Sequence, residues 1–196
     1  MIKNMSLGEF MAKPRLIDQV LLGLGGFNQM VAVAARTVAA LLLVIMTAIV
    51  LLQVFFRYGL NNSLSWTEEL AKIMMVWMAF LVAPWALRQG VNVSIDMFVD
   101  ALPRRLRLGL EVVLQLLILW IIGVFFLESL DFWQRGAAIV AATMPVPMIY
   151  FYSVVPFGFA ALFLVAIELL LRSIMTFIHP SKDWAVPGSL HARREG

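Results

Sequence analysis

The chain has 196 residues, of which 62% are hydrophobic and 14% are charged, and its mean hydropathy is +0.91. Soluble globular domains contain about 45–50% apolar residues and about 25% charged ones, so a globule of 22.0 kDa cannot hide this much apolar surface. We therefore expect an integral membrane protein without a soluble catalytic domain beside it. The sequence contains no cysteine, which excludes disulfides, thiolate metal sites and a cysteine nucleophile.

Four apolar stretches are long enough for membrane-spanning helices, which need roughly 17–25 residues. Their hydrophobic runs are continuous and lack the period of two that is typical of β-barrel strands. The sequence therefore predicts an all-α integral membrane fold with four transmembrane helices, the last of them kinked at Pro156. We expect the spans at about 37–56, 66–87, 108–128 and 147–172.

The basic residues indicate how these spans are oriented. Of the 15 lysines and arginines, only Arg57, Lys72 and Arg135 fall on one side of a four-span arrangement, and the rest fall on the other. Basic residues concentrate in cytoplasmic loops, so we expect both termini in the cytoplasm. The expected units are a cytoplasmic N-terminal segment, a membrane domain and a cytoplasmic tail, at 1–36, 37–176 and 177–196.

Two further segments have helical periodicity but are not expected to span the membrane. Residues 15–35 are moderately apolar, and they form either an interfacial helix or a cytoplasmic extension of the first span. Residues 92–103 place apolar side chains on one face and two aspartates on another. This pattern predicts an interfacial amphipathic helix between spans two and three.

Charged and aromatic residues near the span ends are expected to anchor the chain in the membrane. Basic side chains after the predicted interfacial helix suit anionic lipid headgroups, and tryptophans near span ends suit the interfacial belt. The expected anchors are Trp85, Arg88, Arg104, Arg105 and Arg107.

The spans lack the residues that cofactor, metal or catalytic sites need. The two histidines, His179 and His191, both lie in the tail, so no span supplies a histidine for haem, zinc or a catalytic triad. The glycine-rich run at 23–26 lacks the spacing and the strand–helix context of a phosphate-binding loop. We expect no enzyme, no cofactor and no nucleic-acid partner.

The most structured polar segment is the turn between spans one and two. Ser65 with Glu68 three residues later is a capping-box pattern that marks the start of the second span, and Glu68 and Lys72 are spaced for an i,i+4 ion pair. Two interpretations stay open: caps and salt bridges that only pin a hairpin, or a charged contact surface for a partner. In the second interpretation the contact residues are Arg57, Trp66, Glu68, Glu69 and Lys72.

Some polar and aromatic side chains within the spans are candidates for helix–helix contacts. A glutamine that bridges two helices contributes about 0.6–2 kcal/mol, and a mid-span tryptophan packs on lipid or on a neighbouring helix. The candidates are Gln53, Trp77, Gln115 and Trp120. Glu168 and Arg172 have i,i+4 spacing late in the fourth span and are expected to be an end-of-helix pair of charges.

Several short motifs point to a known family. They are Phe56-Arg57-Tyr58, Ser65-Trp66-Thr67-Glu68-Glu69-Leu70-Ala71, Trp77, Arg88-Gln89-Gly90, Ile95-Asp96 and Leu102-Pro103. Together they resemble the small membrane subunit of TRAP (tripartite ATP-independent periplasmic) transporters, DctQ-like, over about residues 30–175. In one departure, Asn92 stands where the family often has a histidine shortly before the aspartate of this loop. No role of that histidine is therefore carried over.

The resemblance implies a location in the bacterial inner membrane and a set of partners. Such a subunit forms a heterodimer with a separate large membrane subunit, which holds the substrate and cation sites and moves like an elevator. A periplasmic binding protein delivers the solute, usually an organic acid, and the small subunit is a scaffold held at fixed depth by tryptophans, arginines and lipids. The alternative is a stand-alone four-span homo-oligomer or channel, for which span one offers only Thr47 and Gln53 as a polar lining.

Overall fold

A computed structural model of the protein describes residues 16–62, 64–89 and 104–178. Its helices, in chain order, are α2 (Leu16–Gly59), α3 (Ser65–Arg88), α5 (Arg104–Arg135), the 3-10 helix η1 (Gly136–Ala138), α6 (Ile149–Tyr152) and α7 (Val154–Ile178). The interfacial helix predicted at 92–103, which includes Asn92, and the tail beyond residue 178 lie outside the described residues.

Four helical stretches among the described residues are long and apolar enough to cross a membrane, as the sequence predicted. They are Leu21–Gly59, Ser65–Arg88, Leu108–Ala138 and Ile149–Ile178. The second stretch agrees closely with its predicted range, whereas the other three are longer. Hydropathy marks only the apolar centre of a helix, while the helix itself continues through charged residues such as Glu128, Asp131 and Arg135 of α5.

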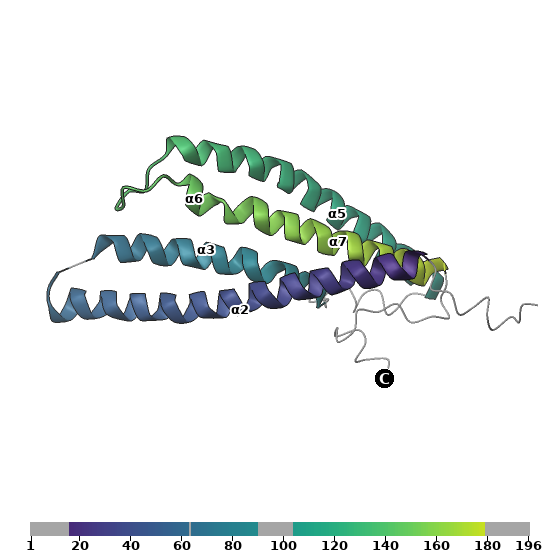
Figure 1. The fold of residues 1–196 in the computed structure, drawn as a ribbon, viewed down its shortest axis with the longest axis horizontal. Coiled ribbons are helices and arrows are strands. Elements are labelled where there is room, and N and C mark those ends of the chain that lie inside the picture. The colour runs from purple at the N-terminus through teal and green to yellow at the C-terminus, as the bar shows by residue number, and fades with distance from the viewer. Residues whose placement is uncertain (1–15, 63, 90–103, 179–196) are drawn as a thin grey trace, which may run out of the picture.

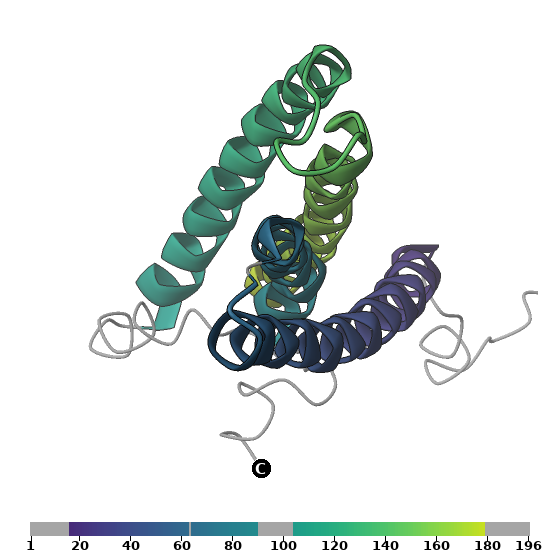
Figure 2. The same cartoon turned by 90° about the vertical axis from the view of Figure 1, so that its left-hand side faces the viewer.

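The first helix, α2, is continuous over 44 residues. At a rise of about 1.5 Å per residue it is about 66 Å long, roughly twice the thickness of a hydrocarbon core of about 30 Å. Residues 16–35 are therefore helical and continuous with the first span, and the glycines at 23, 25 and 26 do not end the helix. Figure 2 shows that α2 curves along its length.

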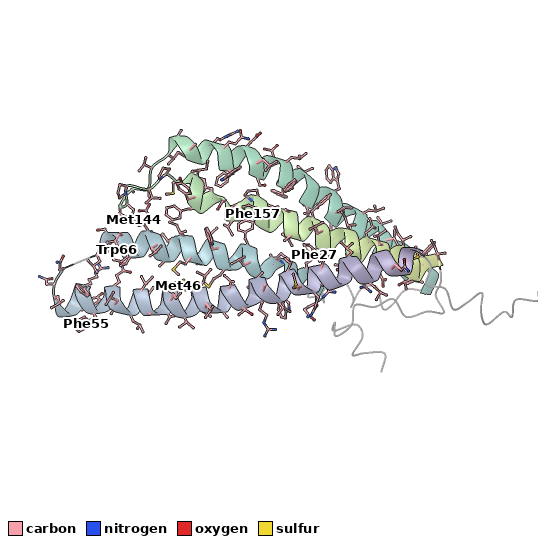
Figure 3. The ribbon with its side chains drawn as sticks, in the orientation of Figure 1. Phe27, Met46, Phe55, Trp66, Met144 and Phe157 are labelled. Atoms are coloured by element: carbon pink, nitrogen blue, oxygen red, sulfur yellow. The ribbon has the colours of Figure 1, made fainter. Side chains whose placement is uncertain are left out.

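The four long helices form an open layer in the order α5, α7, α3, α2. The central helix α7 packs on α5 and on α3, and α3 packs on α2, so that α2 and α5 lie at opposite edges (Figure 1, Figure 2). Burial follows this order: in the apolar part of the α7 span 33% of the residues are buried, compared with 6% for each edge helix. Figure 3 shows the same contrast within α2, where Met46 lies toward α3 and the exposed Phe55 points away.

Aromatic rings and a glycine fill the contacts of α7. Phe159 meets Phe80 of α3 with ring centroids 5.5 Å apart, and it stacks on Phe125 of α5 at 5.7 Å. Gly158 permits the close approach of α7 to α3, because a Cβ at this position would lie 2.8 Å from Cδ1 of Phe80. Small residues serve this purpose in membrane helices, where association depends on close packing.

The fourth span is interrupted near its start. α6 ends at Tyr152 and α7 begins at Val154, with Pro156 buried in the first turn of α7. The sequence predicted a kink at Pro156, and the interruption lies three residues earlier, at Ser153. The reason is that a proline ring clashes with the carbonyl four residues before it, here that of Tyr152, and cannot donate a hydrogen bond to it.

The turn between α2 and α3 is short. Asn61 has a positive φ of 48°, in the left-handed region that asparagine tolerates better than most residues. α3 begins at Ser65, as predicted, but the predicted capping box is wrong, because Leu64 is the N-cap residue and no side chain caps the helix. The hydroxyl of Thr67 donates to the Leu64 carbonyl at 2.6 Å, and the Glu68 carboxylate is engaged one turn further along α3.

Candidate functional site

The early part of α2 lies against α3 and α7 toward one end of the layer (Figure 1), and charged side chains of these helices bind one another there. Phe27 marks this end in Figure 3. Each of the three helices contributes polar groups to one interior position. The group, called the buried charge cluster below, consists of Asn28 from α2, Arg88 from α3, and Glu168 and Arg172 from α7, with the exposed Gln29 of α2 at its edge.

Glu168 is the centre of the buried charge cluster and is 0% exposed. Its carboxylate accepts hydrogen bonds from Asn28 Nδ2 at 2.8 Å, from Arg88 Nε and Nη2 at 3.2 Å each, and from Arg172 Nε at 3.1 Å and Nη2 at 2.9 Å. Hydrogen bonds between ionised groups are stronger than neutral ones. They offset the desolvation that makes an isolated buried carboxylate so unfavourable.

Arg88 joins all three helices through one guanidinium, which is buried at 6% exposure. Its Nη2 donates to the Gly25 carbonyl at 3.0 Å, its Nη1 donates to Gln29 Oε1, and its Nε contacts Glu168. From the sequence we expected Arg88 to anchor the chain at the membrane surface. The structure instead turns the side chain inward, because a buried carboxylate on α7 lies within reach and takes the place of lipid headgroups.

Glu168 and Arg172 form the i,i+4 ion pair that their spacing predicted, with Arg172 Nη2 2.9 Å from Glu168 Oε1. The expectation that this pair consists of ordinary end-of-helix charges is wrong, because the carboxylate is fully buried between helices. The sequence contained a signal for this, since Glu168 follows the uncharged run 136–167. An acidic residue within a membrane span is by default a candidate for a functional or structural site.

Gly25 allows α2 to approach the buried charge cluster closely. A Cβ at this position would lie 2.9 Å from Arg172 Nη2 and 3.0 Å from Glu168 Oε1. Gly23, only two residues earlier on the same helix, faces open space within 4 Å. The requirement for glycine is therefore local to the crossing point of α2.

A second polar contact, called the loop contact below, lies at the opposite end of the layer. Glu69 of α3 accepts hydrogen bonds from the loop that precedes α6: its Oε1 from Ala142 N at 3.0 Å, and its Oε2 from Thr143 N at 2.8 Å and from the Thr143 hydroxyl. Figure 3 shows Met144 of this loop above the start of α3. Glu69 therefore links the α2–α3 half of the layer to the α5–α7 half.

The other residues expected at this corner stay on the surface. Glu68 and Lys72 form the predicted ion pair at 2.8 Å, with side chains that are 60% and 69% exposed. The Arg57 guanidinium lies 5.8 Å from the ring centroid of Tyr58, and Trp66 is exposed. The structure thus divides the expected corner into one carboxylate that binds a loop and a set of outward-facing groups.

The four candidates for helix–helix contacts have different environments. Trp77 Nε1 donates to the Phe151 carbonyl at 2.9 Å, so this tryptophan joins α3 to α6. Trp120 is 67% exposed, so the described helices leave most of this side chain uncovered, unlike a residue at a helix–helix contact. Gln53 and Gln115 are half-buried, and neither side chain forms a hydrogen bond within the described residues.

The remaining expected anchors are only partly described. The Arg36 guanidinium lies 4.9 Å from the ring centroid of Trp85, which places a cation over the ring as in a cation–π interaction. Arg104, Arg105 and Arg107 belong to the first turn of α5. Their side chains lie outside the described part of the chain, so their contacts with lipid stay a prediction.

The chemistry available to these groups is that of holding helices together. Five donors already surround the Glu168 carboxylate, which leaves little room for a ligand. In the described ranges no group of three or more histidine, aspartate or glutamate side chains is placed to hold a metal ion. The arrangement joins α2, α3 and α7 through the Glu168 carboxylate.

Comparison with known proteins gives one family and several relatives. The family model described as "Tripartite ATP-independent periplasmic transporters, DctQ component" matches residues 46–176, which is more than half of the chain. The match covers α3, α5 and most of α7, as well as the end of α2 from residue 46 onward.

Three relatives are similar over different stretches. A putative TRAP transporter small permease protein of Haemophilus influenzae is 39% identical over 62 residues, which is 32% of this chain and 38% of that protein. The sialic acid TRAP transporter small permease protein SiaQ of Vibrio cholerae is 27% identical over 117 residues, or 60% of this chain and 68% of that protein. The isethionate TRAP transporter permease protein DctMQ of Oleidesulfovibrio alaskensis is 26% identical over 107 residues, 54% of this chain but only 16% of that protein.

Proposed function

The chain belongs to the DctQ family of small permease subunits of TRAP transporters, and from this premise we propose that it is the stationary scaffold of a solute-uptake system. The family is one of transporter permeases and not of enzymes, and its members are multi-pass proteins of the bacterial inner membrane. The proposal concerns how this subunit contributes to transport.

The open layer of helices is the observation that carries the scaffold role. An elevator mechanism needs a stationary partner against which a transport domain moves through the bilayer. The layer has a thin core and leaves the outer faces of both edge helices exposed and apolar, which suits a subunit that is covered by lipid and by a neighbouring protein. Its strongly buried polar groups tie helices together and are saturated by each other.

We expect the main partner to be a large membrane subunit, in a heterodimer. The DctMQ relative supports this, because the stretch that matches our chain is only 16% of a much longer permease protein. We expect the large subunit to be a polypeptide separate from the open layer described here. A periplasmic binding protein would complete the system and deliver the solute.

The transported solute is expected to be an organic acid taken up together with a cation. Two relatives carry sialic acid and isethionate in their names, and these solutes have a carboxylate and a sulfonate group, respectively. The substrate and cation sites would lie in the large subunit, since the polar groups described above are engaged with one another.

The expected orientation places both termini in the cytoplasm, because the basic residues concentrate on that side. The buried charge cluster then lies near the cytoplasmic surface and the loop contact near the periplasmic one. The predicted interfacial helix at 92–103 and the lipid contacts of Arg104, Arg105 and Arg107 would hold the scaffold at constant depth.

The periplasmic corner is the expected site of contact with the large subunit or with the binding protein. Its outward-facing groups are Arg57, Trp66, Glu68 and Lys72, whereas Glu69 is occupied by the loop contact. An exposed ion pair in the first turns of a span contributes little to the stability of its own chain. Its charges are therefore available for a partner.

Co-purification from native membranes tests the scaffold role. The affinity-tagged chain would be expressed with its genomic neighbours, purified in mild detergent and analysed by mass spectrometry. We expect a large membrane protein in roughly equal amount, and uptake of an organic acid by proteoliposomes only when both subunits and the binding protein are present. Recovery of this chain alone, as a homo-oligomer that survives detergent exchange, would instead support the channel alternative.

A further inference from the structure

The course of α2 across the layer depends on a small number of polar contacts. α2 follows α3 for most of its length and reaches α7 at the end that holds the buried charge cluster. Asn28 of α2 reaches two groups of α7: it donates to the Leu164 carbonyl at 3.2 Å and to Glu168 at 2.8 Å. Residues 16–24 continue α2 beyond this crossing.

The third helix takes part in the same crossing. The Arg88 guanidinium donates to the Gly25 carbonyl at 3.0 Å, to Gln29 on the next turn of α2 and to Glu168 of α7. These bonds connect two successive turns of α2 to the last residue of α3 and, through Glu168, to α7. A planar guanidinium imposes direction on its partners, so the bonds specify an angle as well as a distance.

The apolar contacts at this crossing are small. The buried apolar residues of α2 nearest the cluster are Leu21 and Ala32, while Leu22 and Met30 on neighbouring turns are exposed. Leu24 and Val31 are half-buried, so the described apolar side chains of α2 make only a partial contact here, which constrains a crossing angle less than fully interlocking side chains would. Directional hydrogen bonds are therefore needed to select one angle.

We propose that the buried charge cluster is a clasp that sets the angle at which α2 crosses α3 and α7. With the clasp closed, the first third of α2 is held against α7. With the clasp removed, the first third of α2 pivots about the crossing while the rest of the layer keeps its packing. This role belongs to the chain by itself and does not depend on the transport system proposed above.

The sequence favours a direct distance measurement, because the chain contains no cysteine. Two pairs of spin labels would be introduced in the full chain in lipid nanodiscs and measured by pulsed electron paramagnetic resonance. The first pair, Leu22→Cys with Phe177→Cys, reports the crossing of α2 and α7. The second pair, Tyr58→Cys with Tyr150→Cys, reports the opposite end of the layer. All four positions are exposed.

The key variant removes every charge of the clasp and keeps its volume: Arg88→Met, Glu168→Leu and Arg172→Met together. Replacing buried ion pairs by apolar residues of similar size commonly preserves stability, so this variant is expected to fold. We expect the first distance distribution to broaden and to move to longer distances, and the second to stay unchanged. Glu168→Gln should produce the same change in a weaker form.

The exposed ion pair supplies the matched control. Glu68→Gln removes a carboxylate of the same kind from the surface and should leave both distance distributions unchanged. If the apolar triple variant keeps the narrow native distribution at the crossing, then apolar packing sets the angle and the clasp is refuted. If the distributions at both ends broaden together, the cluster stabilises the whole layer and does not act as a local clasp, which also overturns the proposal.

Discussion

Two polar contacts at opposite ends of the layer use the same functional group in different surroundings. In the buried charge cluster, Glu168 is surrounded by guanidinium and amide donors from three helices and has no contact with solvent. In the loop contact, Glu69 accepts bonds from Ala142 and Thr143 at the surface. The comparison shows that burial decides what a carboxylate contributes. An unpaired buried charge is strongly destabilising, whereas an exposed one is hydrated by water.

The largest effect is expected from Glu168→Ala. This change leaves two guanidiniums in the interior without their carboxylate, and breaking a buried pair in this way costs about 3–5 kcal/mol in the free energy of unfolding. The measurement is detergent-induced unfolding in mixed micelles, followed by the fluorescence of the 6 tryptophans. Glu69→Ala is the control, and a loss of stability no larger than in this control would remove the distinction between the two ends.

The next largest effect is expected from a glycine at the buried charge cluster, where close packing can be tested without changing a charge. Gly25→Ala adds a methyl group 2.9 Å from Arg172 Nη2, and overpacking of this kind costs about 1–3 kcal/mol. Gly23→Ala adds the same group in open space and should gain up to about 1 kcal/mol from helix propensity. Unfolding of the two variants side by side gives the difference. Equal stabilities of the two variants would show that α2 shifts at the crossing to make room for the methyl group, and that the buried charge cluster tolerates this shift.

Local patterns were sufficient to predict contacts within one helix but not contacts between helices. The continuous apolar runs predicted four spans, and i,i+4 spacing predicted the Glu68–Lys72 pair, because both depend on residues close together in the sequence. The buried charge cluster joins residues 80 and 140 positions apart. Periodicity within one helix carries no information about which ends meet, so Arg88 was assigned to the membrane surface.

Trp120 is a second example in which the pattern within one helix does not tell which of its faces meets another helix. A tryptophan in the middle of a span was compatible with lipid or with a helix contact, and only the order of helices in the layer decides between them. Since α5 is an edge helix, its outward face has no neighbour among the described helices, and Trp120 is exposed there. Trp77 lies on the inner helix α3 and finds the Phe151 carbonyl. For Glu168 the sequence did contain a signal of burial, because this residue follows a long run without charges.

A smaller and more local effect is expected from Glu69→Gln. The amide keeps the size of the side chain but is a weaker acceptor than the carboxylate, so the backbone amides of Ala142 and Thr143 lose charge-assisted hydrogen bonds. Hydrogen–deuterium exchange of the loop at 139–148 should accelerate, while exchange within α7 stays unchanged. Acceleration that spreads through α7 would mean that the loop contact supports the whole layer and is not a local tie.

The smallest effect on the isolated chain is expected from Lys72→Ala, which breaks an ion pair with both partners exposed. Side-chain entropy and screening by salt cancel most of the attraction in such pairs, so the unfolding midpoint should not change measurably at low or high salt. Because the variant leaves the stability of the isolated chain unchanged, it can be used to test contacts in the complex. Because the pair does not hold its own chain together, any loss of co-purification or uptake with Lys72→Ala or Glu68→Gln must come from a contact outside the chain. Unchanged assembly and uptake in both variants would exclude the Glu68–Lys72 pair as a docking surface and leave only Arg57 and Trp66 as outward-facing candidates at this corner.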